Sequence, residues 1–193
     1  MQINNGKLSC ARQVSTQHLD ERCDSTDINL LVVHNIPLPP NQFGGPYIEQ
    51  LFKGTLKPDD DPFFEQIYQL RVSAHCLIRR DGEIVQFVPF DKRAWHAGLS
   101  SFQGRAKCND FSIGIEMEGA DHIPYTDEQY QSLLSVSEAI MQAYPKINLS
   151  RVVGHQDIAP FRKTDPGVSF DWSRYRVQLG LALKQLQSLK GNP

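Results

Sequence analysis

The clearest apolar run in the chain, residues 28–33, is typical of a buried strand. It consists mainly of leucine and β-branched residues, as in strands that are covered on both faces. His34 and Asn35 follow it directly, and Pro37 comes soon after. We therefore expect the strand to end at His34, with polar side chains at its carboxyl end, where α/β proteins place their chemistry.

A second strand is predicted at residues 111–118, where apolar and other residues alternate with a period of two. One face is then apolar, and the other carries Ser112, Gly114, Glu116 and Glu118. Two carboxylates on one face are ordinary if that face is solvated. Gly114, however, leaves room for a group to approach Glu116 closely, which makes Glu116 the better candidate for acid–base chemistry.

Shorter patterns predict the other strands and the helices. Residues 72–78 and 83–88 flank Asp81-Gly82, a strong signal for a hairpin, and residues 151–154 form a short strand before His155. Helices are expected at residues 47–52, after Asp61-Pro62, from the capping box Thr126/Gln129 to Pro145, and from Trp172 onward. His75 lies within a strand, so we expect it to support the site without binding a metal.

Two segments show no clear period. Residues 1–27 are interpreted as an irregular N-terminal arm, and residues 91–110 as a long loop of the kind that is often functional. In this loop Trp95 and Phe102 either line the floor of a ligand site or pin the loop to the core. His96 is likewise either structural or part of the site.

Composition narrows the classes of protein that fit. A chain of 193 residues with 40% hydrophobic and 22% charged residues is long enough for one globular domain. A net charge of −2 lacks the basic excess typical of nucleic-acid binding. No run reaches the roughly 20 apolar residues of a membrane span, and the first 29 residues lack a secretory signal, so we expect a complete cytoplasmic chain. The four cysteines form no C-x-x-C pair and are interpreted as free thiols.

The stretch from Val153 to Gly167 concentrates ionisable residues and prolines in fifteen positions. His155 and Asp165 are natural metal ligands, and His34 is the candidate for a third. Two imidazoles and one carboxylate leave a tetrahedral position open, as in catalytic zinc sites, although histidines so far apart in sequence can each be ordinary. Asp157 in the same stretch is expected to cap a local turn.

Two further residues complete a set suited to amide hydrolysis. Glu116 could take a proton from water and pass it to a leaving amine, and Lys163 could stabilise the oxyanion of a tetrahedral intermediate. An Arg-Lys pair such as Arg162-Lys163 is ordinarily solvated, but here it lies between two candidate ligands.

These residues resemble the zinc-dependent N-acetylmuramoyl-L-alanine amidases, and within them the branch that acts on 1,6-anhydro-muropeptides. The resemblance covers roughly residues 29–175. It is carried by LLVVHNIPLPP at 30–40, FGGPYIEQLF at 43–52, RVSAHCLIRRDGEIVQFVPFDKRAWHAG at 71–98, CNDFSIGIEMEG at 108–119 and GHQDIAPFRKTDPG at 154–167.

The resemblance implies a single α/β domain at residues 28–190, with a mixed central sheet flanked by helices, as in phage amidases and peptidoglycan recognition proteins. It also implies one zinc ion on His34, His155 and Asp165, with Glu116 as the acid–base residue and Lys163 stabilising the transition state. The implied substrate is a muropeptide that is cut between the lactyl group of anhydro-N-acetylmuramic acid and L-alanine, in the cytoplasmic recycling of wall fragments. Asn35, Arg71 and Arg162 are the expected substrate-binding residues.

Two alternatives share this fold. One is a recognition module that binds muropeptides without cutting them, and the other is an amidase that acts on intact cell wall. The retained ligand set favours an enzyme over a binding module. We expect a monomer whose partner is the small muropeptide, with no nucleic acid and no membrane involved.

Overall fold

A six-stranded mixed sheet organises the chain, of which the computed structural model describes residues 1–190. The strand order is β12-β5-β11-β6-β7-β3. The β12-β5-β11-β6 part is parallel, β6 and β7 are antiparallel, and β7 and β3 are parallel. The predicted fold class is confirmed. The strands of this sheet are β3 (Arg12–Gln13), β5 (Leu30–Ile36), β6 (Cys76–Ile78), β7 (Ile84–Gln86), β11 (Ser112–Glu118) and β12 (Val152–Gly154).

The central strands β5 and β11 divide the interior into two sides. Leu31 and Val33 of β5 belong to the same apolar cluster as the buried residues of α2 and α4, whereas Leu30 and Val32 pack in a cluster on the opposite face. Because side chains alternate along a strand, His34 points to this second face. All seven residues of β11 are buried, so the alternative in which its two carboxylates lie on a solvated face does not apply.

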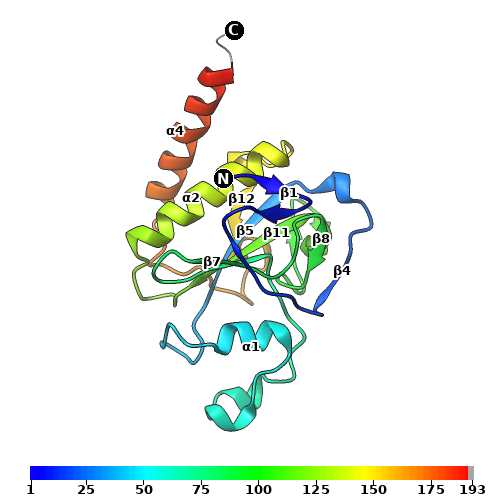
Figure 1. Cartoon of the computed structure of the whole chain (residues 1–193), viewed down its shortest axis with the longest axis vertical. Coiled ribbons are helices and arrows are strands. Elements are labelled where there is room, and N and C mark those ends of the chain that lie inside the picture. Colours follow the sequence, from blue (N-terminus) through cyan, green and yellow to red (C-terminus); the bar gives the residue numbers. More distant parts are fainter. Residues whose placement is uncertain (191–193) are drawn as a thin grey trace.

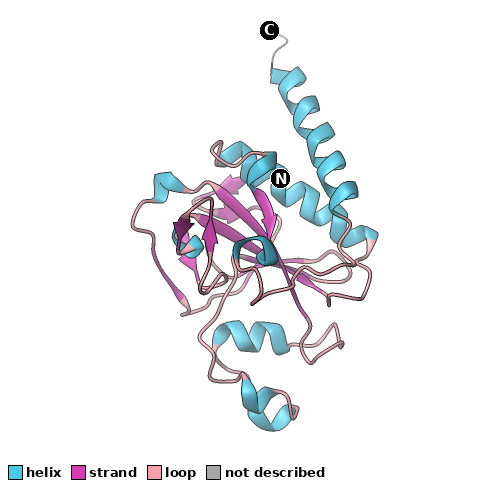
Figure 2. Cartoon of the chain, turned by 180° about the vertical axis from the view of Figure 1, so that it is seen from behind, coloured by secondary structure: helices cyan, strands magenta, loops and turns pink. Residues whose placement is uncertain are grey.

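Two long helices cover the first face. Helix α2 (Asp127–Ala143) begins at the predicted capping box of Thr126 and Gln129, and α4 is Trp172–Lys190. Figures 1 and 2 show the two helices on one side of the sheet, with the far end of α4 projecting from the body. The Ser137 and Tyr175 hydroxyls, 2.6 Å apart, form a buried hydrogen bond between them.

Helix α1 (Tyr47–Lys53) lies at the other end of the molecule (Figure 1) and ends at Gly54, which has the left-handed conformation expected of a helix terminus. The helix predicted after Asp61-Pro62 is only a single 3-10 turn, η3 (Phe64–Gln66), although Phe64 is buried as expected. The other 3-10 turns are η1 (Ser25–Asp27), η2 (Pro58–Asp60), η4 (Cys108–Asp110) and η5 (Leu149–Arg151).

Several predicted boundaries are corrected by the structure. Strand β5 continues past His34 to Ile36, because its neighbour β11 supplies partners along that whole length. Residues 91–110 are not one open loop, since they contain three short strands and η4. These strands are β8 (Lys92–Ala94), β9 (Ser101–Phe102) and β10 (Arg105–Ala106).

The N-terminal arm is more regular than predicted. It contains β1 (Ile3–Asn4), β2 (Lys7–Leu8) and β4 (Leu19–Glu21), and its β3 extends the central sheet. Such two- and three-residue strands are too short to show a hydrophobic period. Arg22 anchors the arm, because its buried guanidinium donates hydrogen bonds to backbone carbonyls. These are the carbonyls of Phe90, Asn109, Asp110 and Ser112.

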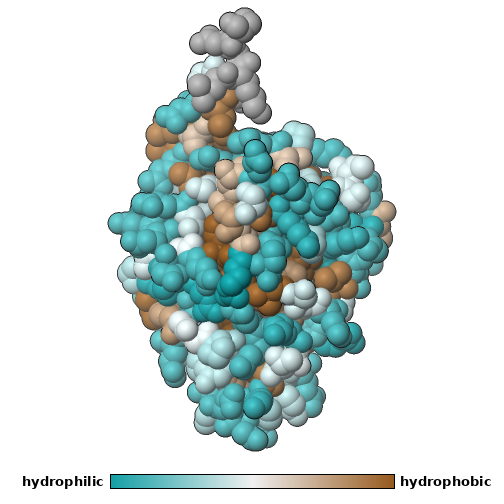
Figure 3. Space-filling view, in the orientation of Figure 1, coloured by the Kyte–Doolittle hydropathy of each residue, from teal (hydrophilic) through white to brown (hydrophobic). Residues whose placement is uncertain are grey.

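The cysteines are free, as predicted: Cys10 and Cys23 are exposed, and Cys76 and Cys108 are buried. Burial raises the pKa of the Cys108 thiol, which argues against its being reactive. The face shown in Figure 3 is mostly hydrophilic, with apolar residues visible at its centre and along α4. Within residues 1–190 no helix is both long and apolar enough to span a bilayer.

Replacing Arg22 by methionine should lower the free energy of unfolding by at least about 3 kcal/mol, because several buried carbonyls lose their donor. Lys146→Met is the matched control, since Lys146 also binds the N-terminal region, through Thr26, but from an exposed position. It should cost under about 1 kcal/mol. Urea denaturation of both variants measures the difference, and equal losses would contradict an anchoring role for Arg22.

Candidate metal centre

The register of the two central strands brings the first two predicted residues together. Strands β5 and β11 run parallel, and Glu116 lies directly beside His34. Both side chains point to the face opposite α2 and α4. Polar groups at neighbouring positions near the carboxyl ends of parallel strands are the usual start of an α/β site.

His155 and Asp165 come from the segment that follows β12. His155 opens the one-turn helix α3 (His155–Ile158), and Asp157 accepts a hydrogen bond from the Gly154 amide at 2.7 Å, which confirms its capping role. The chain then turns back, and the Gln156 amide donates to the Asp165 carbonyl at 3.0 Å. This return places the Asp165 carboxylate beside the two histidines.

The three predicted ligands converge on one point. His34 Nδ1 lies 3.0 Å from His155 Nδ1 and 3.1 Å from Asp165 Oδ2, and His155 Nδ1 lies 3.0 Å from the same carboxylate oxygen. Zinc–ligand bonds of about 2.0–2.2 Å in a tetrahedron place ligand atoms roughly 3.3 Å apart. The triangle therefore has nearly the size that a tetrahedral metal ion requires.

The protonation states of these side chains also favour binding of a cation. Burial lowers the pKa of His34 to about 4, so its ring is neutral. His155 Nε2 lies 3.1 Å from the Ala97 carbonyl, which has no hydrogen to donate, so Nε2 carries a proton. In the neutral ring, which is the form that binds a metal, Nδ1 then presents a lone pair. A cation is the group that satisfies such a set.

Glu116 has the environment of a general acid–base residue. Its side chain is 8% exposed, and Oε2 has no hydrogen-bond partner among the residues that the structure describes. Burial, with a smaller contribution from the charge of Asp165, raises the pKa of Glu116 well above its ordinary value. A carboxyl group shifted in this way can exchange protons nearer neutral pH.

Lys163 is exposed, on the loop between α3 and Asp165. It lies close enough for its positive charge to lower the pKa of both His34 and Glu116. It therefore provides a positive charge near His34 and Glu116.

The three predicted substrate-binding residues lie in different settings. The Asn35 amide nitrogen donates to Asp121 Oδ1 at 2.8 Å and to the Pro166 carbonyl at 3.1 Å, which leaves its own oxygen as an acceptor. Arg71 is exposed, with its guanidinium over the Trp95 ring. Arg162 is exposed but uses Nη2 to bind the carbonyls of Ala97 and Leu99. A role in substrate binding stays a prediction for all three.

The sequence alone did not establish the roles of the residues that surround the three candidate ligands. His96 was ambiguous, and the structure places its Nδ1 2.9 Å from His34 Nε2. Trp95 donates to Asp20 at 2.7 Å and stacks on His18, so it ties the loop to the N-terminal arm. Asn109 gave no signal in the sequence, because its role depends on a loop contact. His75 Nδ1 accepts a hydrogen bond from the Gly114 amide at 3.0 Å, so it supports the backbone of β11.

Comparisons with known proteins agree on one family. The family model described as N-acetylmuramoyl-L-alanine amidase matches residues 24–168. The 1,6-anhydro-N-acetylmuramyl-L-alanine amidase AmpD of Escherichia coli is 61% identical over 177 residues, which are 92% of this chain and 96% of that protein. A crystal structure of an AmpD derivative superposes with a TM-score of 0.90 at 60% identity, over 92% of this chain and 99% of the other.

A more distant structure contains a ligand. It is the N-acetylmuramyl-L-alanine amidase AmiD from E. coli in complex with the substrate anhydro-N-acetylmuramic acid-L-Ala-D-gamma-Glu-L-Lys. It is 29% identical, with a TM-score of 0.58, over 79% of this chain and 57% of that one.

Replacing Glu116 by glutamine should stabilise the metal-free protein, increasingly as pH rises. The unfolded glutamate titrates near 4.5, whereas the folded pKa is raised. Between these values the folded protein keeps a proton that the unfolded chain has released, so stability falls with rising pH. Glutamine does not titrate and avoids this loss.

Urea denaturation with a chelator, at about pH 4 and about pH 7, measures the effect. The gain from Glu116→Gln should be larger at the higher pH, while exposed Glu65→Gln should show little change at either. A gain that shrinks as pH rises would show that the pKa of Glu116 is not raised.

Proposed function

Because the chain belongs to the N-acetylmuramoyl-L-alanine amidase family, we propose that it hydrolyses the amide bond between the lactyl group of 1,6-anhydro-N-acetylmuramic acid and L-alanine of the stem peptide. Two facts support this choice of substrate. The chain aligns with 96% of a relative named for that activity, at 61% identity, and the structure of a related amidase is a complex with such a substrate. The observation that carries the proposal is the convergence of His34, His155 and Asp165 beside Glu116.

We propose one zinc ion per chain, held by His34 Nδ1, His155 Nδ1 and an oxygen of Asp165. The donor set supports zinc, since two imidazoles and a carboxylate are typical of catalytic zinc sites with a fourth position open. When bound, zinc supplies a Lewis acid that polarises a carbonyl and makes water more acidic.

Glu116 is the proposed proton carrier. Its buried carboxylate accepts a proton from the attacking water and donates it to the leaving nitrogen of L-alanine, so that the amine departs uncharged. The raised pKa of Glu116 suits both steps. Its unpartnered Oε2 supports this role, because no hydrogen bond must break before the proton moves.

Lys163 is proposed to stabilise the negative charge that develops on the carbonyl oxygen of the substrate. Removing such a donor costs roughly 3 kcal/mol in other hydrolases. The electrostatic influence of Lys163 on His34 and Glu116 supports this placement.

The stem peptide carries carboxylates, for which arginine is the best partner. We propose Arg71 and the remaining N–H groups of Arg162 for these contacts, and the free oxygen of Asn35 for a peptide N–H. The fixed positions of Asn35 and Arg162, each bound to neighbouring loops through nitrogen atoms, support this assignment because little side-chain entropy is lost on binding.

We place this hydrolysis in the cytoplasmic recycling of wall fragments, as the sequence resemblance implies, and propose that the enzyme is a monomer. An amidase that acts on intact wall would share the chemistry but meet a different substrate. Cell fractionation tests the location, and the assay below separates the substrates.

The purified protein should release free stem peptide from anhydro-N-acetylmuramyl-tripeptide, and a chelator should abolish release until zinc is restored. Release from intact sacculi should be much slower, because the proposed substrate is the small soluble fragment. Peptide release is measured by chromatography. Full activity after complete removal of zinc would disprove metal catalysis, and preference for sacculi would favour the alternative amidase.

Asp165→Ala and Glu116→Gln should separate metal binding from turnover. Asp165→Ala removes a ligand and should lose both zinc and activity, whereas Glu116→Gln should keep zinc but lose roughly 100- to 10,000-fold in kcat. Metal analysis and tripeptide release measure the two effects. Asp171→Ala, at the start of α4, is the control and should change neither. Equal loss of zinc from both site variants would contradict the separate roles.

A further inference from the structure

His96 occupies a space that a glycine keeps open beside the metal centre. A Cβ atom at Gly114 would lie 2.4 Å from His96 Cγ, so only glycine permits the ring to pack against β11. The ring meets His34 edge-on, with Nδ1 of His96 2.9 Å from Nε2 of His34. The sequence led us to expect that Gly114 leaves space for a group near Glu116. In the structure the His96 ring occupies the space beside Gly114.

The hydrogens around His96 can be assigned from one short contact. Ser112 Oγ lies 2.6 Å from the Cys108 carbonyl oxygen. Two oxygens at this distance need a hydrogen between them, and only the hydroxyl can supply it. Ser112 Oγ then has no hydrogen left for His96 Nε2, 3.1 Å away, so Nε2 is the donor.

This assignment extends to the metal ligand. The His96 ring is buried against the rings of His34 and His75, and its partners among the described residues are His34 and Ser112, with no carboxylate to stabilise a positive charge. The ring is therefore neutral, and a neutral ring that carries its proton on Nε2 accepts at Nδ1. His34 must therefore donate from Nε2, and its Nδ1 is left as a lone pair. That lone pair points toward His155 and Asp165, the direction that metal coordination requires.

The backbone carbonyl of Ala97, the next residue, fixes the tautomer of His155 in the same way. The Ala97 carbonyl lies 3.1 Å from His155 Nε2 and also accepts from Arg162 Nη2 at 2.8 Å. Two consecutive residues, His96 and Ala97, thus fix the tautomers of both metal histidines.

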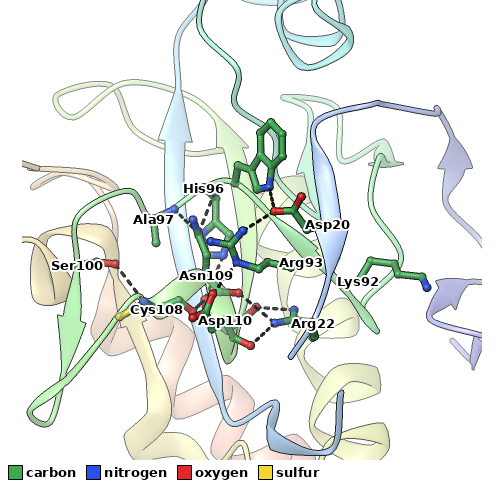
Figure 4. Close-up of polar contacts among 12 residues, drawn as sticks. Asp20, Arg22, Lys92, Arg93, His96, Ala97, Ser100, Cys108, Asn109 and Asp110 are labelled. Atoms are coloured by element: carbon green, nitrogen blue, oxygen red, sulfur yellow. Dashed lines mark hydrogen bonds and ion pairs between the residues drawn. The ribbon is translucent and has the colours of Figure 1, made fainter. Parts of the chain in front are cut away.

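A single side chain holds these two residues in place. Asn109 Oδ1 accepts hydrogen bonds from the backbone amides of His96, at 3.1 Å, and Ala97, at 2.8 Å. Figure 4 shows Asn109 between the labelled His96 and Ala97, with these contacts dashed. Asn109 is buried and lies in η4, just before β11. The side chain that holds His96 and Ala97 is therefore connected to the same strand that carries Glu116.

We propose that His96 and Asn109 are positioning residues that hold His34 and His155 in the Nε2–H tautomer, so that the metal centre is assembled before the metal binds. This rests on the metal site of the proposed function but not on its substrate. The outer partners of metal-bound histidines commonly contribute about 10- to 100-fold to metal affinity.

The first experiment needs no variant. Nitrogen-15 NMR of the imidazoles in the metal-free protein should show His34 and His155 protonated on Nε2. A His34 ring protonated mainly on Nδ1 would overturn the proposal. This measurement involves neither zinc nor substrate, so it remains decisive if the protein proves to bind no zinc or to cleave no muropeptide.

The second experiment compares two substitutions of His96. His96→Asn keeps an acceptor at the same number of bonds from Cβ as Nδ1, whereas His96→Leu fills the space without one. Zinc affinity, measured by competition with a chromophoric chelator, should fall roughly 10- to 100-fold in His96→Leu and recover most of that loss in His96→Asn. The His34 tautomers should become mixed only in His96→Leu.

The third experiment applies the same logic to Asn109. Asn109→Asp keeps the accepting Oδ1 and should bind zinc better than Asn109→Ala, in which the tautomers of both histidines should become mixed. Tyr175→Phe is the matched control, because it removes a buried hydrogen bond from the α2–α4 side of the sheet. Unchanged affinity in His96→Leu, or equal losses in all variants including the control, would show that His96 and Asn109 serve folding alone.

Discussion

Two imidazole nitrogens and one carboxylate oxygen converge inside this protein, and much of the structure serves to hold them there. The two imidazole nitrogens and one carboxylate oxygen lie 3.0–3.1 Å apart, at which distance acceptors repel unless a cation lies between them. Each comes from a different part of the chain: His34 from a strand, His155 from the first turn of a helix, and Asp165 from a loop. A buried arrangement of this kind persists only if packing elsewhere supports it.

That support comes from the unequal faces of the central sheet. One face packs apolar side chains against α2 and α4, and the hydrophobic effect over this large area stabilises the fold as a whole. The other face can then tolerate buried polar groups such as Glu116 and His96, whose desolvation is unfavourable. The small residues Ser112 and Gly114 on this face provide the space and the hydroxyl that His96 needs.

The predictions succeeded where the signal is local. The capping box at Thr126, the helix end at Gly54 and the hairpin at Gly82 are each decided by a few neighbouring residues, and all three are in place. The N-terminal arm and residues 91–110 were interpreted as irregular because their strands of two or three residues cannot display a period. Those strands form only because partners distant in sequence, such as β7 for β3, supply the hydrogen bonds.

By itself the sequence supplied the candidate residues of the site: two histidines, an aspartate, a glutamate and a lysine. It also determined the burial of the first central strand, through its unbroken apolar run. Only the tertiary structure decided which nitrogen of each histidine presents its lone pair, because that depends on His96, Ala97 and Asn109. Hydrogen bonds between loops depend on distance and angle in three dimensions, and the order of residues along a chain contains neither.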